Sequence, residues 1–92
     1  MNTLLVGYDL NRSGQRYKDL LKLLKSTGVW WHNLDSTLLL KTDETPSELL
    51  DKLVRLKLVD SNDEVLIIDV TGRLFDSYGF SQTGTEWLEK HL

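Results

Sequence analysis

The spacing of apolar side chains divides this chain into short and distinct elements. Residues 3–10 are mostly apolar at consecutive positions, which indicates a strand in the middle of a covered sheet. Between residues 15 and 25 the apolar positions recur at helical spacing, and Gly28 follows as a stop signal. Residues 29–32 and 37–41 are each typical of a short strand, and the turn-forming Asn, Asp and Ser between them predict a hairpin.

A second helix has a clear start signal. Thr45 can cap it, Pro46 suits its first position, and Glu48 completes a capping box. Its apolar positions continue to about Val59.

The remaining pattern predicts one more strand and a tail. Residues 64–70 form an apolar run that contains a single acid, Asp69, which needs a partner if it is buried. Thr71 and the residues after it offer such partners, so we expect a structural role for this acid. The aromatic segment 75–80 is expected to pack on the sheet or on a neighbouring subunit, and residues 85–91 predict a short terminal helix.

The order strand, helix, strand, strand, helix, strand is that of an α+β, ferredoxin-like βαββαβ fold. It predicts an antiparallel sheet of order 4-1-3-2 with two helices on one face. We expect residues 1–72 to form this domain and residues 73–92 to be an extension that packs on the sheet or on a dimer partner. The topology also predicts that one end of the sheet gathers polar residues: Asp9, Asn11, Arg12, His32, Asn33, Asp35, Ser36, Asn62 and Asp63.

The composition limits the kinds of binding site that this chain can contain. The 92 residues suffice for one domain, and 40% hydrophobic with 27% charged residues is ordinary for a globular protein. Without cysteine there is no disulfide or thiolate zinc site, and two histidines are too few for a His-only metal centre. A bound metal would therefore have oxygen ligands, and we expect Mg²⁺ or Mn²⁺ and no organic cofactor.

Charge and hydropathy bear on partners and location. No apolar run approaches the ~18 residues of a membrane span, and the chain starts directly in a strand, so we expect a cytoplasmic protein without a membrane partner. The formal net charge of -3 gives no general attraction for phosphate backbones. Nucleic-acid binding would therefore need a local basic patch or bridging cations.

Asp9, at the end of the first predicted strand, is the first candidate for chemistry. A carboxylate at the rim of a sheet can hold a hard divalent cation, which polarises a phosphoryl oxygen and lowers the pKa of an attacking water. The alternative is a strand-end acid that is hydrogen-bonded to the following turn. Tyr8, just before it, would line the same site.

The turn after Asp9 is a candidate anion site. Asn11, Arg12 and Ser13 precede the first helix, where free backbone N–H groups and the helix dipole favour an anion, and Arg16 is close in sequence. The turn lacks the repeated glycines of a phosphate loop. Ser13 can equally serve only as the helix cap.

The hairpin supplies the other candidate contacts. Trp30 and Trp31 point to opposite faces of a strand, so one is expected in the core and the other at the rim, where it could stack on a base or anchor an interface. His32, beside Asp35 and Ser36, is a candidate proton donor or acceptor. The alternative is a hydrogen-bonded surface histidine.

Taken in order, these motifs resemble the small ferredoxin-like superfamily that contains CRISPR-associated protein two and the VapD ribonucleases, and they are most similar to its SinR-like branch. The resemblance covers residues 1–70 and is carried by residues 6–11, 28–32, 34–37 and 63–72. It implies a homodimer in which Asp9 faces its dimer mate and holds a divalent cation in a ribonuclease or deoxyribonuclease site.

Three functions are compatible with this sequence. The first is a homodimeric nucleotide- or nucleic-acid-binding protein, which the resemblance places in a phage- or defence-related setting. The second is a divalent-metal-dependent endoribonuclease or endonuclease with Asp9 as its catalytic residue, and the third is a non-catalytic protein-interaction subunit. The acidic balance and the few catalytic side chains favour binding over cleavage.

Overall fold

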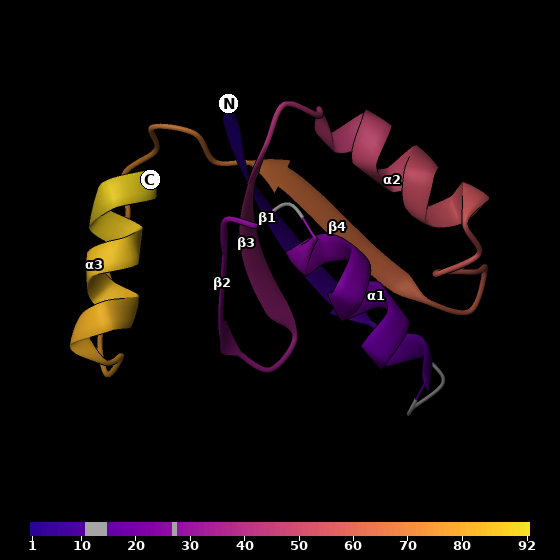
Figure 1. Ribbon diagram of the computed structural model, residues 1–92, viewed down its shortest axis with the longest axis horizontal. Coiled ribbons are helices and arrows are strands. Elements are labelled where there is room, and N and C mark those ends of the chain that lie inside the picture. The colour runs from indigo at the N-terminus through magenta and orange to yellow at the C-terminus, as the bar shows by residue number, and fades with distance from the viewer. Residues whose placement is uncertain (11–14, 27) are drawn as a thin grey trace.

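The computed structural model describes residues 1–10, 15–26 and 28–92, without the side chains of residues 15 and 16. These described residues form four strands and three helices (Figure 1). In chain order the elements are β1 (Asn2–Asp9), α1 (Gln15–Lys25), β2 (Trp30–Leu34), β3 (Thr37–Thr42), α2 (Pro46–Arg55), β4 (Glu64–Asp69) and α3 (Gln82–His91).

The four strands make one antiparallel sheet of order β2-β3-β1-β4. This is the predicted order 4-1-3-2 counted from the opposite edge. β1 lies inside the sheet between β3 and β4, as its apolar run predicted, while β2 and β4 form the edges. The protein is therefore a small α+β domain.

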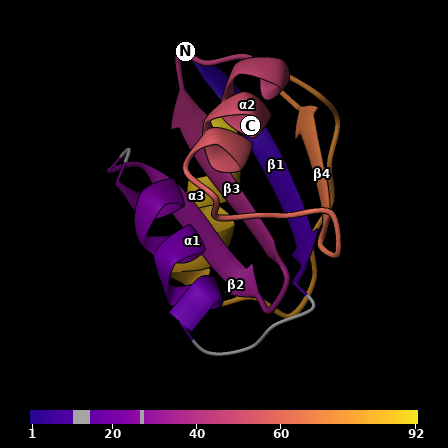
Figure 2. The ribbon, with the colours of Figure 1, turned by 90° about the vertical axis from the view of Figure 1, so that its right-hand side faces the viewer.

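Helices α1 and α2 cover one face of the sheet (Figure 2). Alternate residues of β1 and β3 point toward them, because side chains along a strand alternate between its two faces. The core between these layers is mainly aliphatic, and its fully buried members are Leu4, Val6, Leu20, Leu24, Leu38, Leu40 and Leu53.

Helix α3 lies on the opposite face, where it covers the β2 and β3 side of the sheet (Figures 1 and 2). Trp31 and Leu39 of the sheet pack against Leu88 of the helix. The Trp31 indole donates a hydrogen bond of 3.1 Å to the carbonyl oxygen of Gly84. Its ring is nearly perpendicular to that of Phe80, and the two ring centres are 4.9 Å apart. This second, smaller core fixes α3 to the sheet.

The start of α3 differs from the sequence prediction. The helix begins at Gln82, three residues before the expected start at Thr85, because Ser81 caps it and its hydroxyl accepts a hydrogen bond from the Gly84 amide. Its first turn has no apolar residue to show the helical period, so pattern alone missed it.

A buried polar network ties the end of α3 to the sheet. The hydroxyl of Thr3, a fully buried side chain, donates to the His91 carbonyl oxygen at 2.8 Å. Lys41 donates to the Thr3 hydroxyl at 3.1 Å and to the same carbonyl at 3.4 Å. The lysine thus places a positive charge at the negative end of the helix dipole, which stabilises the docked helix.

The position of His91 predicts that stability decreases as the medium is acidified. Partial burial, followed by the nearby charges of Lys41 and Lys90, lowers the pKa of His91. When the pH drops below the ordinary histidine pKa of about 6.5, the unfolded chain therefore binds more protons than the folded chain. The free energy of unfolding then decreases as the pH is lowered. We expect the His91→Gln variant to lose less thermal stability than the wild type between about pH 7.5 and pH 5.5. Equal losses in thermal melts of the two proteins would contradict this.

The end of α2 corrects a second boundary. The apolar pattern predicted a helix to about Val59, but the helix ends at Arg55 because Lys57 adopts a left-handed conformation with φ of 59°. The amide of Lys57 donates to the Val54 carbonyl, and the amide of Leu58 donates to the Leu53 carbonyl. This pair of bonds is the Schellman motif, in which the left-handed position is usually glycine.

Lys57→Gly is expected to stabilise the protein by about 1 kcal/mol, because glycine adopts the left-handed conformation without the strain that a side chain carries there. Urea unfolding measures the change, and the unchanged motif should leave the slope of the transition as it is. Lys52→Gly, inside the same helix, should be destabilising and serves as the matched control. A destabilised Lys57→Gly variant would show that the side chain of Lys57 contributes more than its backbone strain costs.

Part of the second sheet face is left uncovered by the described residues. On this face Gly7 of β1 is flanked by Leu66 of β4, and Leu66 and Ile68 are 60% and 43% exposed. β1 itself is largely buried, as predicted, and Asp9 at its end is exposed. In the segment 75–80, which was expected to pack, Phe80 packs against Trp31 whereas Tyr78 is exposed.

None of the helices in the described part of the chain is both long and apolar enough to cross a bilayer.

Candidate functional site

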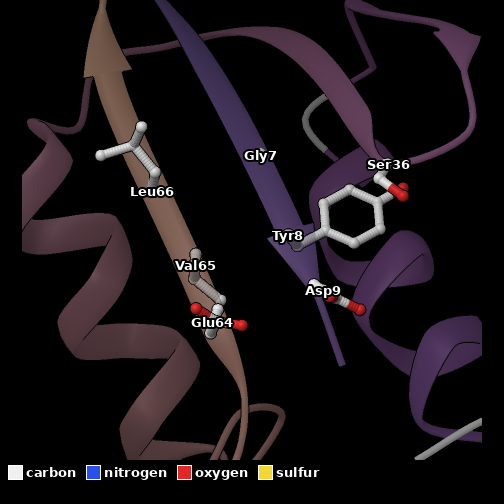
Figure 3. Close-up of a pocket in the computed structure, with 7 residues that line it drawn as sticks. All are labelled: Gly7, Tyr8, Asp9, Ser36, Glu64, Val65 and Leu66. Carbon is white, nitrogen blue, oxygen red and sulfur yellow. The ribbon is translucent and has the colours of Figure 1, made fainter. Parts of the chain in front are cut away.

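A shallow groove lies where β1 ends and β4 begins (Figure 3). We call it the β1–β4 groove. It has a volume of about 460 Å³, and its lining residues are Gly7, Tyr8, Asp9, Ser36, Glu64, Val65 and Leu66. It contains Asp9, the first candidate from the sequence, together with Ser36 of the hairpin turn.

Two acidic residues on neighbouring strands line this groove. Asp9 and Glu64 are directly opposite in the antiparallel register of β1 and β4, so both side chains leave the same face of the sheet. Like charges in this position are destabilising. Among the described residues no lysine or arginine forms an ion pair with either acid. The pair therefore keeps two adjacent negative charges that the folded chain does not neutralise within its described part.

Gly7 lies beside this pair and lines the groove with backbone alone. A β-carbon added there would meet only the Leu66 carbonyl oxygen, at 4.0 Å, so the packing of the chain itself has room for a side chain. Glycine inside a strand weakens it and often marks a place where a ligand or another backbone approaches closely. The groove is thus open to a close approach from outside.

Tyr8 lines the groove, but its hydroxyl is directed to the hairpin. The hydroxyl donates to the main-chain carbonyl of Asp35 at 3.2 Å and lies 3.2 Å from His32 Nε2. Burial, then the nearby Tyr17 and Asp35, raise the pKa of Tyr8, so its proton stays in place. Which of Tyr8 and His32 donates in their mutual contact depends on the histidine tautomer. In either case Tyr8 contacts the ring of His32.

The predicted pairing of His32 with Asp35 takes another form. The Asp35 carbonyl, rather than its carboxylate, enters the network, and Tyr8 stands between the two residues. His32, Asp35 and Ser36 do gather at the predicted end of the sheet.

The two tryptophans point to opposite faces, as the strand pattern predicted. Trp31 is 5% exposed and belongs to the core under α3, so a ligand cannot stack on it without displacing the helix. Trp30 is 39% exposed, and Lys25 Nζ lies 4.4 Å from the centre of its ring. Of these two, Trp30 is therefore the tryptophan that remains accessible for stacking.

The predicted anion site cannot be placed. Asn11, Arg12 and Ser13 lie outside the described residues, and so does the side chain of Arg16. At the other end of the sheet, Asp69 is exposed rather than buried. The hydroxyl and the amide of Thr71 donate to its carboxylate at 2.6 Å and 3.0 Å, and these two bonds lower the pKa of Asp69. Thr71 is thus the predicted partner.

A second pocket lies between the edge of β2 and the first turns of α3. It has a volume of about 170 Å³ and is lined by Trp30, Trp31, His32, Asn33, Ser81, Thr83, Gly84 and Trp87. We call it the edge pocket. β2 is irregular beside it: Trp31 pairs with Leu39 but Leu34 pairs with Thr37, so β2 holds one extra residue. Such bulges redirect side chains and are common next to functional sites.

Sequence reasoning missed Glu64 and Trp87 as site residues, and it expected Asn33 at this end of the sheet without assigning it to a binding site. A signal for Glu64 was present, because an antiparallel pairing of the first and fourth strands brings the end of one beside the start of the other. No such signal existed for Asn33 and Trp87, since their pocket depends on where α3 docks.

Two carboxylates alone make only a partial metal site. No group of three or more histidine, aspartate or glutamate side chains in the described part of the chain is placed to hold a metal. Asp9 and Glu64 offer the hard oxygen ligands that Mg²⁺ and Mn²⁺ prefer, and these ions often bind through one or two carboxylates plus water and phosphate. The donor set therefore suits a cation that is shared with a phosphate ligand.

Comparisons with protein-family models, with curated proteins and with solved structures each gave no match.

Proposed function

We propose that this protein binds a divalent cation between Asp9 and Glu64 and, through that cation, the phosphate of a nucleotide or nucleic acid. The observation that carries the proposal is the register of β1 and β4, which sets the two carboxylates opposite each other in an open groove. Such a pair costs stability in the free protein, and a bound cation removes that cost.

The cation also explains how an acidic protein can hold a polyanion. The net charge of -3 and the two groove acids repel phosphate unless a positive charge stands between them. The hydroxyl of Ser36 in the same groove can donate to a phosphate oxygen. The predicted phosphate contacts Asn11, Arg12, Ser13 and Arg16 follow Asp9 in sequence and belong to the same proposed site.

We further propose that the domain is ferredoxin-like and works as a homodimer. The element order βαββαβ and the sheet order support the fold. The uncovered side of the sheet supports self-association, because Gly7, Leu66 and Ile68 leave apolar surface exposed beside the groove. Sedimentation equilibrium with and without Mg²⁺ reports the subunit number, and a monomer at all concentrations would remove this part of the proposal.

Cleavage is the second candidate function, and the same two carboxylates support it. A divalent cation supplies Lewis acidity and lowers the pKa of bound water. Asp9 and Glu64 would hold that cation, and His32, which contacts Tyr8, is a candidate for a proton carrier at the hairpin. Binding stands first because it requires only the cation site.

The test of binding uses a fluorescein-labelled single-stranded RNA and its DNA counterpart. Anisotropy should rise with protein concentration in Mg²⁺ or Mn²⁺ and should stay low when EDTA replaces the cation. Intact oligonucleotide on a denaturing gel separates binding from cleavage. Equal binding in EDTA would contradict a cation-mediated contact, and absence of binding in both media would reject the proposed function.

A further inference from the structure

We propose that the edge pocket binds a nucleobase that carries an exocyclic amine, and that adenine fits it best. The inference rests on the proposed nucleotide-binding function and names the base it would take. The edge pocket and the β1–β4 groove both adjoin the hairpin end of the sheet, one through His32 and Asn33 and the other through Ser36. A phosphate and a base of one ligand strand can therefore be held at the same end of the molecule.

The size of the edge pocket favours a single ring system. Its volume of about 170 Å³ is below the roughly 300–1,000 Å³ that is usual for drug-sized ligands. A nucleobase can enter while its sugar stays outside. Trp87, which is half-buried, forms an aromatic wall, and its ring centre lies 4.5 Å from that of His91. A fixed indole is a favourable stacking surface for a base.

The edge pocket offers specific hydrogen-bond donors and acceptors to a base. The His32 ring is directed to Tyr8 on the other face of the sheet, so the polar side chain of β2 that can contact a base in this pocket is Asn33. The side-chain amide of Asn33 has one acceptor oxygen and two donor hydrogens. Adenine presents the matching set, because its N6 amine donates and its N7 accepts, and asparagine is a common bidentate partner for this edge.

Two features of the chain place Asn33 at α3. Successive side chains of β2 alternate between the two faces, so His32 reaches Tyr8 on one face while Asn33 lies against Gly84 of α3 on the other. Gly84 makes room for it, since a β-carbon there would come within 3.1 Å of Asn33 Nδ2. Glycine inside a helix costs stability, and the close amide accounts for it here.

Uracil is the discriminating ligand. It is as flat as adenine, but it presents carbonyl oxygens where adenine presents its amine, and a carbonyl cannot donate to the side-chain oxygen of Asn33. A pocket that merely stacks flat rings would bind both bases equally. A pocket that reads the amine should prefer adenosine by about tenfold, the factor expected for one good bidentate contact.

The experiment titrates ¹⁵N-labelled protein with adenosine or uridine in EDTA, so that neither phosphate nor cation contributes. Adenosine should produce saturable shifts of the Trp87 indole and Asn33 side-chain amide signals, and uridine should bind about tenfold more weakly. Asn33→Asp, which keeps the shape but removes the donor, should weaken adenosine about tenfold. Asn62→Asp, outside the pocket, adds the same charge and should leave the affinity unchanged.

Gly84→Ala is the second variant, and it tests the base site even if Asn33→Asp does not fold. Its methyl group favours the helix but displaces the Asn33 amide, so thermal stability should hold while adenosine affinity falls. Equal binding of adenosine and uridine, absence of adenosine shifts, or full affinity in folded Asn33→Asp would overturn the base site. Because the titration contains no metal, its failure is separable from failure of the cation-dependent RNA binding.

Discussion

Replacement of Trp31 by alanine is expected to destabilise the protein by about 3–5 kcal/mol, a large part of the roughly 5–15 kcal/mol that holds most domains folded. The indole is the centre of the smaller core, where it contacts Leu39, Leu88 and Phe80. Truncation removes this packing and leaves the Gly84 carbonyl without the indole donor. We expect α3 to separate from the sheet before the remainder unfolds, because the main core under α1 and α2 is intact.

Urea unfolding combined with amide hydrogen exchange measures both effects. Trp31→Ala should expose the amides of α3 first, whereas those of β1 and β3 should stay protected. Trp31→Phe, which keeps most of the apolar volume but not the indole donor, should be less destabilising and is the matched control. A loss below about 1 kcal/mol would mean that α3 contributes little to stability and that Trp31 is free for another role.

Asp9→Asn is expected to weaken Mg²⁺-dependent RNA binding by about tenfold to a hundredfold, because a neutral amide is a poorer ligand for a hard cation than a carboxylate. The same change should not lower thermal stability in the absence of metal, since it removes the like-charge contact with Glu64. Gain or retention of stability together with lost binding distinguishes a ligand-binding acid from a structural one.

Glu64→Gln should behave in the same way, because the two acids act as a pair. Asp51→Asn, on the exposed side of α2, removes the same charge at a distance from the groove and should leave binding unchanged. If all three variants bind RNA as the wild type does, the groove is not where the ligand binds. If Asp51→Asn is as weak as Asp9→Asn, the effect is one of net charge.

Much of the fold could be predicted because local pattern and topology agree. The capping box at Thr45 and Glu48 forms as expected, with both hydrogen bonds present. The strand order followed from the sequence of elements. Boundaries failed where backbone geometry decided them, as at Lys57, whose left-handed conformation no residue preference would indicate.

The candidate site was predictable only in part, for a physical reason. Asp9 and Ser36 were expected at one end of the sheet, and the structure brings them to one groove. Which tryptophan faces outward depends on which face α3 covers, and that docking is set by distant contacts such as the bond from Thr3 to His91. Glu64 could not be recognised as a site residue without its register with Asp9, because register is a property of the pair of strands.

The most direct measurement counts Mn²⁺ ions on the protein by electron paramagnetic resonance, without nucleic acid present. If Asp9 and Glu64 form one cation site, wild-type protein should bind one Mn²⁺ per chain, and both Asp9→Asn and Glu64→Gln should lose it while Asp51→Asn keeps it. Undiminished Mn²⁺ binding by Glu64→Gln, or no binding by the wild type, would contradict the paired-carboxylate site.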